Sequence, residues 1–391
     1  MAAPAGWTAR IPITTNPASI EATMPDGGVG VFATNFEFLE GGDNDEGDIR
    51  AFVDAMLADY SDLVVTQSDG ETTVPYDVRQ FSQVGGSREL SIGLGAPSLS
   101  SAVGTDFYLH RGCTGGPFRD PAGVVPTADG ILGTWPLEDA GETGTASDWT
   151  GVNDGTYHGT VQIAGAVGMG QDIENDDGQR HDNYVALPFD TEIDNLGAFS
   201  ASIWTYRTSG INYQRAVWLR DVGANKHFQL FYHQDLDEIF CTLDVDTGRA
   251  VVEVSEAFAP AGEWVLLSVT WDGSTLRLYI DATERAADAT KSGALDIPDV
   301  SGQAALGNVP GAAWASGWRG YLDEAQLFSR CLSADWIRTA YENQKNNDTF
   351  WTVGAEEAAG GGGPIIGSSI IGSSIIGSGI IIPLPDYIRR R

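Results

Sequence analysis

The chain has little positive charge. Lys and Arg number 22 against 54 Asp and Glu, so the 391 residues carry a formal net charge of −32 at pH 7. An acidic field of this kind repels phosphate backbones, and nucleic acid is therefore not an expected partner. Solubility is the simplest explanation for this charge. A surface adapted to a saline habitat is the second explanation, and carboxylates arranged for Ca²⁺ are the third.

Cysteine is also scarce, and long apolar runs are missing. Cys113, Cys241 and Cys331 lie far apart without a C-x-x-C pair, which argues against a disulfide framework and a zinc ligand set. No stretch of 18 or more uninterrupted apolar residues occurs, so we expect no membrane insertion. Residues 1–7 lack the basic start and apolar core of a secretory signal. We expect either that a signal was removed or that the protein does not use that route.

Glycine and tryptophan, in contrast, are abundant, with 49 and 11 residues. Glycine supplies the positive φ that tight turns need, so the composition favours short strands joined by turns. The strongest single pattern spans residues 264–280, where two apolar runs flank Asp272-Gly273, and it predicts a β-hairpin. A short helix is predicted over residues 333–341, with Ser333 as its N-cap.

The first 120 residues carry three ordered motifs. They are Trp7-Thr-Ala-Arg-Ile-Pro-Ile13, Asp62-Leu-Val-Val-Thr66 and Phe107-Tyr-Leu-His-Arg-Gly112. In this order they resemble a small β-sandwich domain of unknown function, which commonly precedes laminin-G-like domains in bacterial, archaeal and phage surface proteins. The resemblance implies an architecture and no chemistry. Residues 121–129, with two prolines, are interpreted as a linker.

Residues 130–354 carry a longer series of motifs. It includes Trp135-Pro-Leu, Phe199-Ser-Ala-Ser-Ile-Trp204, Trp271-Asp-Gly and Gly320-Tyr-Leu-Asp-Glu324. The series resembles the laminin-G-like, concanavalin-A-like jelly roll. The predicted fold class is therefore all-β: two β-sandwich domains, the second a concanavalin-A-like jelly roll, followed by a low-complexity C-terminal tail over residues 355–391.

The resemblance also implies a cofactor, because such jelly rolls often hold a structural Ca²⁺ between the loop after the first strand and the closing strand. On this chain the implied ligands are Asp148, Asn153, Asp154 and Asp323, and Ca²⁺ prefers such oxygen-rich loops. The alternative is that Asp148 caps its turn and Asp323 binds backbone amides. Both interpretations stay open at this stage.

Carbohydrate binding needs exposed aromatic side chains beside polar groups. Trp149 and Trp314 lie in loops rich in small or turn-forming residues, so we predict that they are exposed. Arg215, Trp218 and His233 are candidates for lining a sheet face. The tryptophans within predicted strands are expected in the core, as large aromatics usually are; they are Trp135, Trp204, Trp264 and Trp271.

No pattern favours catalysis. The acidic stretch Asp172-Ile-Glu-Asn-Asp176 lacks the Glu-x-Asp-x-Glu alternation of the related glucanases, and it lies among loop-forming residues. The five histidines form no H-E-x-x-H pair. We therefore expect no enzyme activity, and a glycan-degrading enzyme is the weakest of the alternatives.

The tail changes character at a flexible hinge of four glycines, residues 360–363. The Ile-Ile-Gly-Ser repeats that follow have high β propensity and little charge, so we predict that this tail docks on a partner. The residues predicted to dock are Ile365, Ile366, Ile370, Ile371, Ile375, Ile376, Arg389, Arg390 and Arg391. A processed C-terminal sorting signal is the competing interpretation, and the missing N-terminal signal weighs against it.

Together these features favour a virion surface or tail protein of a tailed virus. In this hypothesis the jelly roll adheres to glycans or glycoproteins of the host-cell surface, the tail binds other virion proteins, and symmetric copies in a homo-oligomer supply avidity. The expected location is the virion. The alternative is a secreted or cell-surface carbohydrate-binding adhesin.

Overall fold

The computed structural model describes residues 6–20, 32–35, 52–57, 59–84, 87–95, 99–116, 118–124, 130–174, 183–208, 213–310 and 317–358. Side chains are described in these ranges except at 32–35, 79–91, 121–122 and 347–348. Residues 1–359 form one compact unit, and residues 360–391 form a second. Within the described ranges, no helix is long and apolar enough to cross a membrane.

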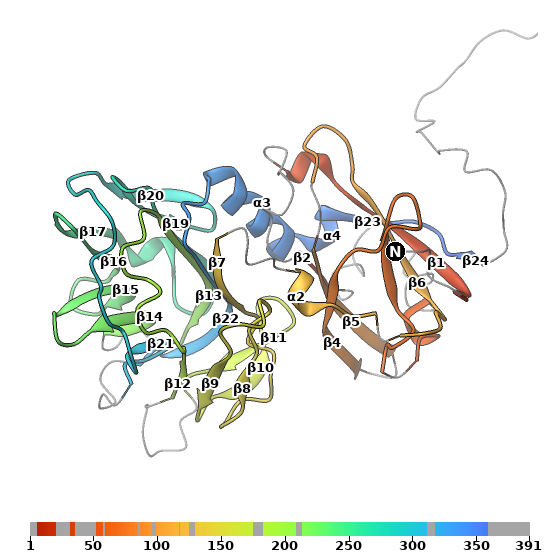
Figure 1. Ribbon diagram of the computed structural model, residues 1–391, viewed down its shortest axis with the longest axis horizontal. Helices are drawn as coiled ribbons and strands as arrows, with labels where there is room; N and C mark the ends of the chain where they lie inside the picture. Colours follow the sequence, from red (N-terminus) through yellow and green to blue (C-terminus); the bar gives the residue numbers. More distant parts are fainter. Residues whose placement is uncertain are drawn as a thin grey trace, which may run out of the picture. The chain divides into compact units, whose positions relative to one another are not determined.

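The N-terminal part contains two antiparallel sheets (Figure 1). In the first, the strand order is β23 (Trp351–Val353), β1 (Ala9–Thr15), β6 (Asp106–Arg111) and β3 (Val64–Gln67), and β24 (Glu357–Ala358) also pairs with β1. In the second, the order is β2 (Phe32–Asn35), β5 (Ser87–Leu94) and β4 (Tyr76–Val84). Residues of β1 alternate between buried and half-buried, because successive side chains of a strand point to opposite faces.

Two eight-stranded sheets form the jelly roll (Figure 1). The β13 sheet has the order β10 (Val161–Ala164), β11 (Met169–Asp172), β22 (Gly320–Phe328), β13 (Phe199–Arg207), β18 (Trp264–Trp271), β19 (Leu276–Ile280) and β20 (Thr283–Asp288), and β7 (Ile131–Trp135) pairs with β22. The β14 sheet has the order β17 (Gly248–Ser255), β16 (Glu238–Val245), β15 (Lys226–His233), β14 (Gln214–Asp221), β21 (Ala304–Leu306), β12 (Tyr184–Ala186), β9 (Gly155–His158) and β8 (Thr145–Ala146). The all-β class is thereby confirmed.

The jelly-roll core lies between these two sheets. It is built from the inward residues of both, among them Trp135, Phe199, Phe228, Trp271 and Leu306. The hairpin predicted over residues 264–280 is confirmed as β18 and β19. At its turn, Asp272 Oδ1 accepts hydrogen bonds from the backbone of Ser274 and Thr275, the local bonding that makes Asp favourable in turns.

Helix α3 (Ala334–Lys345) covers the part of the outer face of the β13 sheet that carries Trp204. Ser333 caps it by accepting a hydrogen bond from the Trp336 backbone at 3.1 Å, as its sequence predicts. The ring of Tyr341 stacks on Trp204 with centroids 5.7 Å apart, and Trp204 Nε1 donates to Gln344 Oε1 at 2.7 Å. The part of the outer face around Trp204 is therefore occupied by the protein itself, while the aromatic rings of Tyr206, Trp264 and Tyr321 on the same face are half-buried.

The short helical elements are η1 (Pro17–Ser19), α2 (Pro121–Val124), η4 (Glu256–Phe258) and α4 (Asn347–Phe350). Helix α4 leads directly into β23, whose residues pair with β1. Phe350 and Trp351 are buried in one core with Ile11 and Phe107. Residues 351–358, after the closing helix of the jelly roll, thus extend the N-terminal sheet.

Candidate functional site

The outer face of the β14 sheet carries a group of cationic, aromatic and polar side chains. Alternation along β14 sends Val217 and Leu219 into the core, so Trp218 and Arg220 point outward. In the register of β14 and β15, Trp218 pairs with Gln229 and Arg220 with His227. We call this set, Arg215, Trp218, Arg220, His227, Gln229 and Arg249, the Trp218 face.

Two guanidinium groups lie over the indole ring of Trp218. The distances from the ring centroid are 4.9 Å to Arg215 Cζ and 5.5 Å to Arg220 Cζ. Trp218 is 4% exposed. The ring therefore supports two arginines through cation–π attraction, and little of its own surface is open to a ligand.

His227 extends the same group. Its ring stacks on Trp218 with centroids 6.1 Å apart, and its Nε2 lies 3.0 Å from Thr242 Oγ1. Burial, with a further contribution from the charge of Arg249, lowers the pKa of His227 to about 4, because both disfavour the charged ring. His227 is therefore neutral near pH 7.

The arginines of this face differ in their partners. Arg249 Nη2 lies 2.8 Å from Asp244 Oδ2, so its charge is balanced. Arg215 Nε contacts Gln229 Oε1 at 3.4 Å, and Arg220 Nη2 donates to Asn225 Oδ1 at 2.9 Å. Among the described residues, three buried donor nitrogens here have no hydrogen-bond partner: Arg215 Nη1, Trp218 Nε1 and Arg220 Nε.

His233 lies at the end of β15, on the same side of the sheet. It contacts the ring of Tyr213 edge-on, with centroids 4.4 Å apart, and the ring of Phe240 at 5.4 Å. Phe231, which pairs with Arg215, stacks on Phe240. The structure thus places Arg215, Trp218 and His233 on one face. Sequence reasoning missed Arg220, His227, Gln229 and Arg249, although the period of two along β14 and β15 could have found the first three.

The prediction that Trp149 is exposed is wrong. Trp149 is 5% exposed and belongs to the core of the N-terminal part, with Ile92 and Leu94 of β5. A Cβ added at Gly93 would lie 2.2 Å from the Trp149 ring, so a glycine is needed for this approach. Trp314 lies outside the described residues.

The carboxylate of Asp148 accepts hydrogen bonds from four donors of the protein. Its Oδ1 accepts from the backbone of Thr134 at 2.8 Å and of Thr150 at 3.0 Å. Its Oδ2 accepts from the Asn153 backbone at 2.9 Å and from the Thr150 hydroxyl. All acceptor positions of the carboxylate are therefore filled by the protein.

The remaining implied calcium ligands are also engaged. Asp154 Oδ1 accepts from the Asp148 backbone at 2.9 Å, and Asn153 Nδ2 donates to the Leu132 carbonyl at 2.6 Å. Asp323 is fully buried and accepts from the backbone of Val167 at 2.9 Å. No group of three or more His, Cys, Asp or Glu side chains in the described ranges is placed to hold a metal ion. These residues fit the loop-capping role and do not offer Ca²⁺ a ready ligand set.

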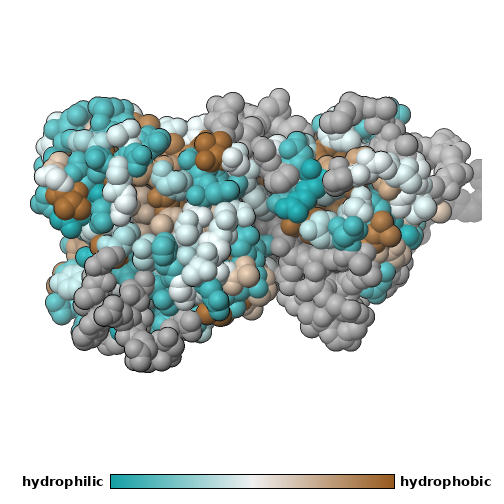
Figure 2. Space-filling view, turned by 60° about the horizontal axis from the view of Figure 1, so that its bottom comes forward, coloured by the Kyte–Doolittle hydropathy of each residue, from teal (hydrophilic) through white to brown (hydrophobic). Residues whose placement is uncertain are grey.

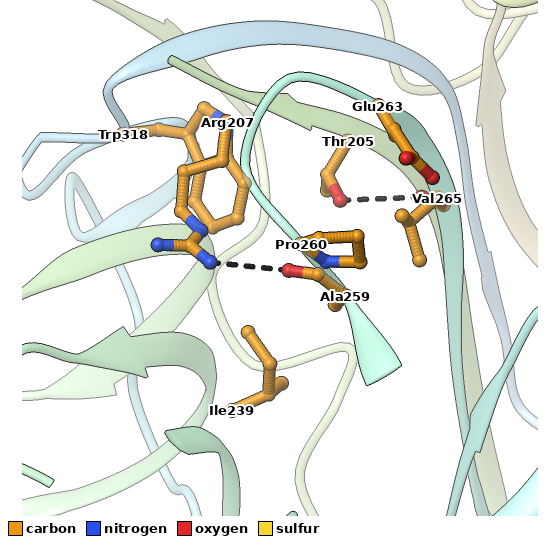
Figure 3. Close-up of a pocket in the computed structure, with 8 residues that line it drawn as sticks. All are labelled: Thr205, Arg207, Ile239, Ala259, Pro260, Glu263, Val265 and Trp318. Carbon is orange, nitrogen blue, oxygen red and sulfur yellow. Dashed lines mark hydrogen bonds between the residues drawn. The ribbon is translucent and has the colours of Figure 1, made fainter. Parts of the chain in front are cut away.

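A small pocket opens beside the jelly-roll core (Figure 3). Arg207 Nη2 donates to the Ala259 carbonyl at 3.1 Å, and Thr205 Oγ1 donates to the Val265 carbonyl at 3.2 Å. The Arg207 guanidinium also pairs with Glu256 at 2.8 Å. The pocket has room for about one water molecule, so it is too small for a sugar.

The acidic stretch weighed for catalysis has structural partners where it is described. Asp172 Oδ1 accepts from the Glu174 backbone at 2.8 Å. Glu174 accepts from the Thr208 hydroxyl, and its Oε1 lies 3.4 Å from Arg319 Nη1. Residues 175 and 176 lie outside the described residues, and so do all the predicted docking residues of the tail, 365–391.

Comparison with known proteins gives one family match. Residues 177–338 match the model described as the concanavalin A-like lectin/glucanases superfamily. No curated protein matches the chain. Among solved structures, domain 4 of AbnA, an extracellular arabinanase from Geobacillus stearothermophilus, solved in complex with arabinotriose, is 17% identical. The match covers 54% of this chain and 98% of that chain, with a TM-score of 0.39.

Two further solved structures are similar. The carbohydrate-binding module CBM40 of a Ruminococcus gnavus sialidase, bound to α2,3-sialyllactose, is 14% identical over 46% of this chain and 96% of that chain, with a TM-score of 0.34. The binding domain of botulinum neurotoxin serotype D is 12% identical over 55% of this chain and 52% of that chain, with a TM-score of 0.41. The family match over residues 177–338 confirms the resemblance to concanavalin-A-like jelly rolls that the sequence predicted for the second domain.

Proposed function

We propose that this protein binds carbohydrate on the Trp218 face. One observation carries the proposal: this face of the β14 sheet presents buried donor nitrogens without protein partners, on Arg215, Trp218 and Arg220. A buried donor that lacks an acceptor costs about 1–3 kcal/mol. Sugars are rich in oxygen acceptors, so a bound glycan would satisfy these groups.

Other features of the same face support the proposal. Arg215, Arg220 and Gln229 are half-buried and Arg249 is exposed, so a ligand can reach them. On the outer face of the β13 sheet, α3 covers Trp204 through Tyr341. On the side of the molecule shown in Figure 2, hydrophobic residues form small separate patches among hydrophilic ones. The superfamily that residues 177–338 match is named for lectins and glucanases, although a fold alone does not fix a function.

We further propose that binding is the whole activity, without catalysis. Glu174, in the stretch weighed for a glycosidase, is held by Thr208 and Arg319. A reducing-end assay on every glycan that binds would test this part. Release of reducing ends that grows with time and protein concentration would overturn it.

A role on a virus particle is the finer part of the proposal, with the tail as the attachment. The residues before the tail support this arrangement, because Arg10 and Arg111 pair with Glu357 and Glu356, each at 2.7 Å. The tail therefore leaves from a strand that is fixed to the N-terminal sheet. Deletion of residues 360–391 should release the protein from purified particles, and particles that still carry the truncated protein would contradict this role. The alternative role is that of a secreted or cell-surface carbohydrate-binding adhesin.

The central test is a glycan array probed with the full chain and two variants. Gln229→Ala and Arg220→Ala should each weaken binding by roughly tenfold, as expected for the loss of one hydrogen bond to a charged or polar ligand group. The matched control is Arg285→Ala, because Arg285 also lies over an aromatic ring, Phe258 at 4.3 Å, but on β20 of the other sheet. An array without any bound glycan would overturn the proposal.

A further inference from the structure

We propose that the glycan bound by the Trp218 face is acidic, with its negatively charged oxygens held between Arg215 and Arg220. This inference rests on the proposed carbohydrate binding and names the chemical class of the ligand. The anionic group can be a carboxylate or a sulfate ester, since both present planar or clustered oxygens to a guanidinium.

The first support is that Arg215 and Arg220 have no carboxylate partner among the described residues. Seven other arginines of the described chain lie against carboxylates, whereas the exposed Arg285 lies over Phe258; the seven are Arg10, Arg111, Arg119, Arg207, Arg249, Arg277 and Arg319. Within the described ranges, Arg215 and Arg220 form no such pair, although the chain has 54 acidic residues. Two half-buried arginines over one ring, with no carboxylate partner among the described residues, indicate a place for an external anion.

The second support is the cost of keeping these two charges together. Arg215 and Arg220 lie over the same ring, 4.9 and 5.5 Å from its centroid. Burial and the neighbouring charge of Arg220 lower the pKa of Arg215, because both disfavour its charged form. An anion bound between them would remove this repulsion. A neutral sugar would accept hydrogen bonds but would leave the repulsion in place.

The third support is geometric. Arg220 is positioned through its Nη2 by Asn225, and Arg215 through its Nε by Gln229. These contacts leave Arg215 Nη1 and Arg220 Nε as unmatched buried donors, with Trp218 Nε1 on the ring between them. Donors already fixed by the protein lose little entropy on binding a ligand. These three donors can therefore bind one acceptor group that has several oxygens.

The acidic side chains on this face do not neutralise the two arginines. Asp244 is held by Arg249 at 2.8 Å and by the His227 backbone at 2.8 Å. Glu238 pairs across the strands with His233, and Glu253 with Phe240. Glu238 therefore lies on the row of His233. Glu253 lies on the row of Arg215, but Phe231 and Phe240 stand between the two residues. The positive charge of Arg215 and Arg220 stays available.

The experiment uses an array on which each acidic glycan stands beside its uncharged parent. Sialylated glycans are paired with desialylated ones, oligogalacturonates with their methyl esters, and sulfated glycans with desulfated ones. We expect the full chain to bind at least one acidic member about tenfold more tightly than its parent, and the three pairs identify the source of the charge. Added salt should weaken this binding.

Substitutions test whether the preference for acidic glycans comes from the Trp218 face. Arg215→Gln and Arg220→Gln should each reduce the acidic-to-neutral ratio toward one, while Arg285→Gln should leave it unchanged. Thermal unfolding of each variant checks that it is folded, and Arg220→Lys, which keeps the charge without the planar fork, should retain part of the preference. Equal binding of acidic and neutral members would overturn this inference and leave carbohydrate binding standing. Binding of no glycan would overturn both.

Discussion

The guanidinium of Arg10 lies 2.7 Å from the carboxylate of Glu357, across 347 positions of the chain. The two residues are direct partners in the pairing of β1 with β24. On the same strand, Ile13 pairs with Val353 of β23. The N-terminal sheet is therefore completed by residues that follow the whole jelly roll, and neither end of the unit 1–359 can be removed without exposing a strand edge.

The first prediction concerns this closure. Trp351 is 1% exposed and packs edge-on against Phe107, with centroids 6.1 Å apart. Trp351→Ala should lower the free energy of unfolding by about 3–5 kcal/mol, the usual cost of removing a large buried aromatic. Chemical denaturation measures the change. A chain that ends at residue 359 is the control and should keep the stability of the full chain; if it is as unstable as Trp351→Ala, the placement of β23 is wrong.

The second prediction concerns metal. Because the Asp148 carboxylate is filled by the Thr134, Thr150 and Asn153 donors, EDTA should leave the melting temperature unchanged. Asp148→Asn should lower the free energy of unfolding by about 1–3 kcal/mol, because buried donors lose their acceptor. The control is Asp299→Asn, at an exposed turn where Asp299 accepts from the Ser301 backbone. A melting temperature that falls with EDTA and recovers with Ca²⁺ would contradict this prediction and support a bound Ca²⁺.

The third prediction concerns the loss of stability at acidic pH. Burial, then the charge of Arg10, lowers the pKa of His110 to about 4, and burial, then Arg249, lowers that of His227 to about 4. The unfolded chain therefore takes up protons near pH 6.5 while the folded chain does not. The contribution of each histidine to the free energy of unfolding is therefore fully present above pH 6.5. It is lost as the pH falls toward 4, by at most about 3 kcal/mol for each histidine. Denaturation at several pH values measures the slope.

Variants separate the histidines from the many carboxylates. His110 Nε2 lies 2.9 Å from Thr66 Oγ1, and the amide of His110→Gln can keep a bond to Thr66 without titrating. This variant should reduce the slope between pH 6.5 and 4.5. His158→Gln, at an exposed position, controls for the loss of a histidine as such. An unchanged slope in His110→Gln would show that carboxylates alone cause the acid sensitivity.

The fourth prediction separates Trp149 from ligand binding. Because Trp149 packs against Gly93 in the N-terminal core, Trp149→Ala should cost about 3–5 kcal/mol of stability, and Gly93→Ala about 1–3 kcal/mol through overpacking. Neither should change the set of glycans bound by the folded protein. Val152→Ala, at a position 66% exposed, is the control. Selective loss of glycan binding in a stable Trp149→Ala protein would return Trp149 to the list of ligand contacts.

The sequence alone determined the features that depend on neighbouring residues. The hairpin of β18 and β19 follows from its alternating residues and Asp-Gly turn, and the N-cap of α3 follows from Ser333. Trp135 and Trp271 are buried in the jelly-roll core, as their strand positions predict. Local backbone geometry sets strand alternation, turns and caps, so a short stretch of sequence suffices for them.

Only the tertiary structure decided what covers each outward face. Trp204 points away from the jelly-roll core, and α3 buries it. Trp149 follows a turn-rich loop, and the packing of β5 against it makes it a core residue. Trp218 lies in an outward position, and Arg215 and Arg220 cover its ring. Alternation along a strand fixes which face a side chain takes, but the burial of Trp204 and Trp149 depends on segments far away in the chain, because free energy is gained only where two surfaces meet.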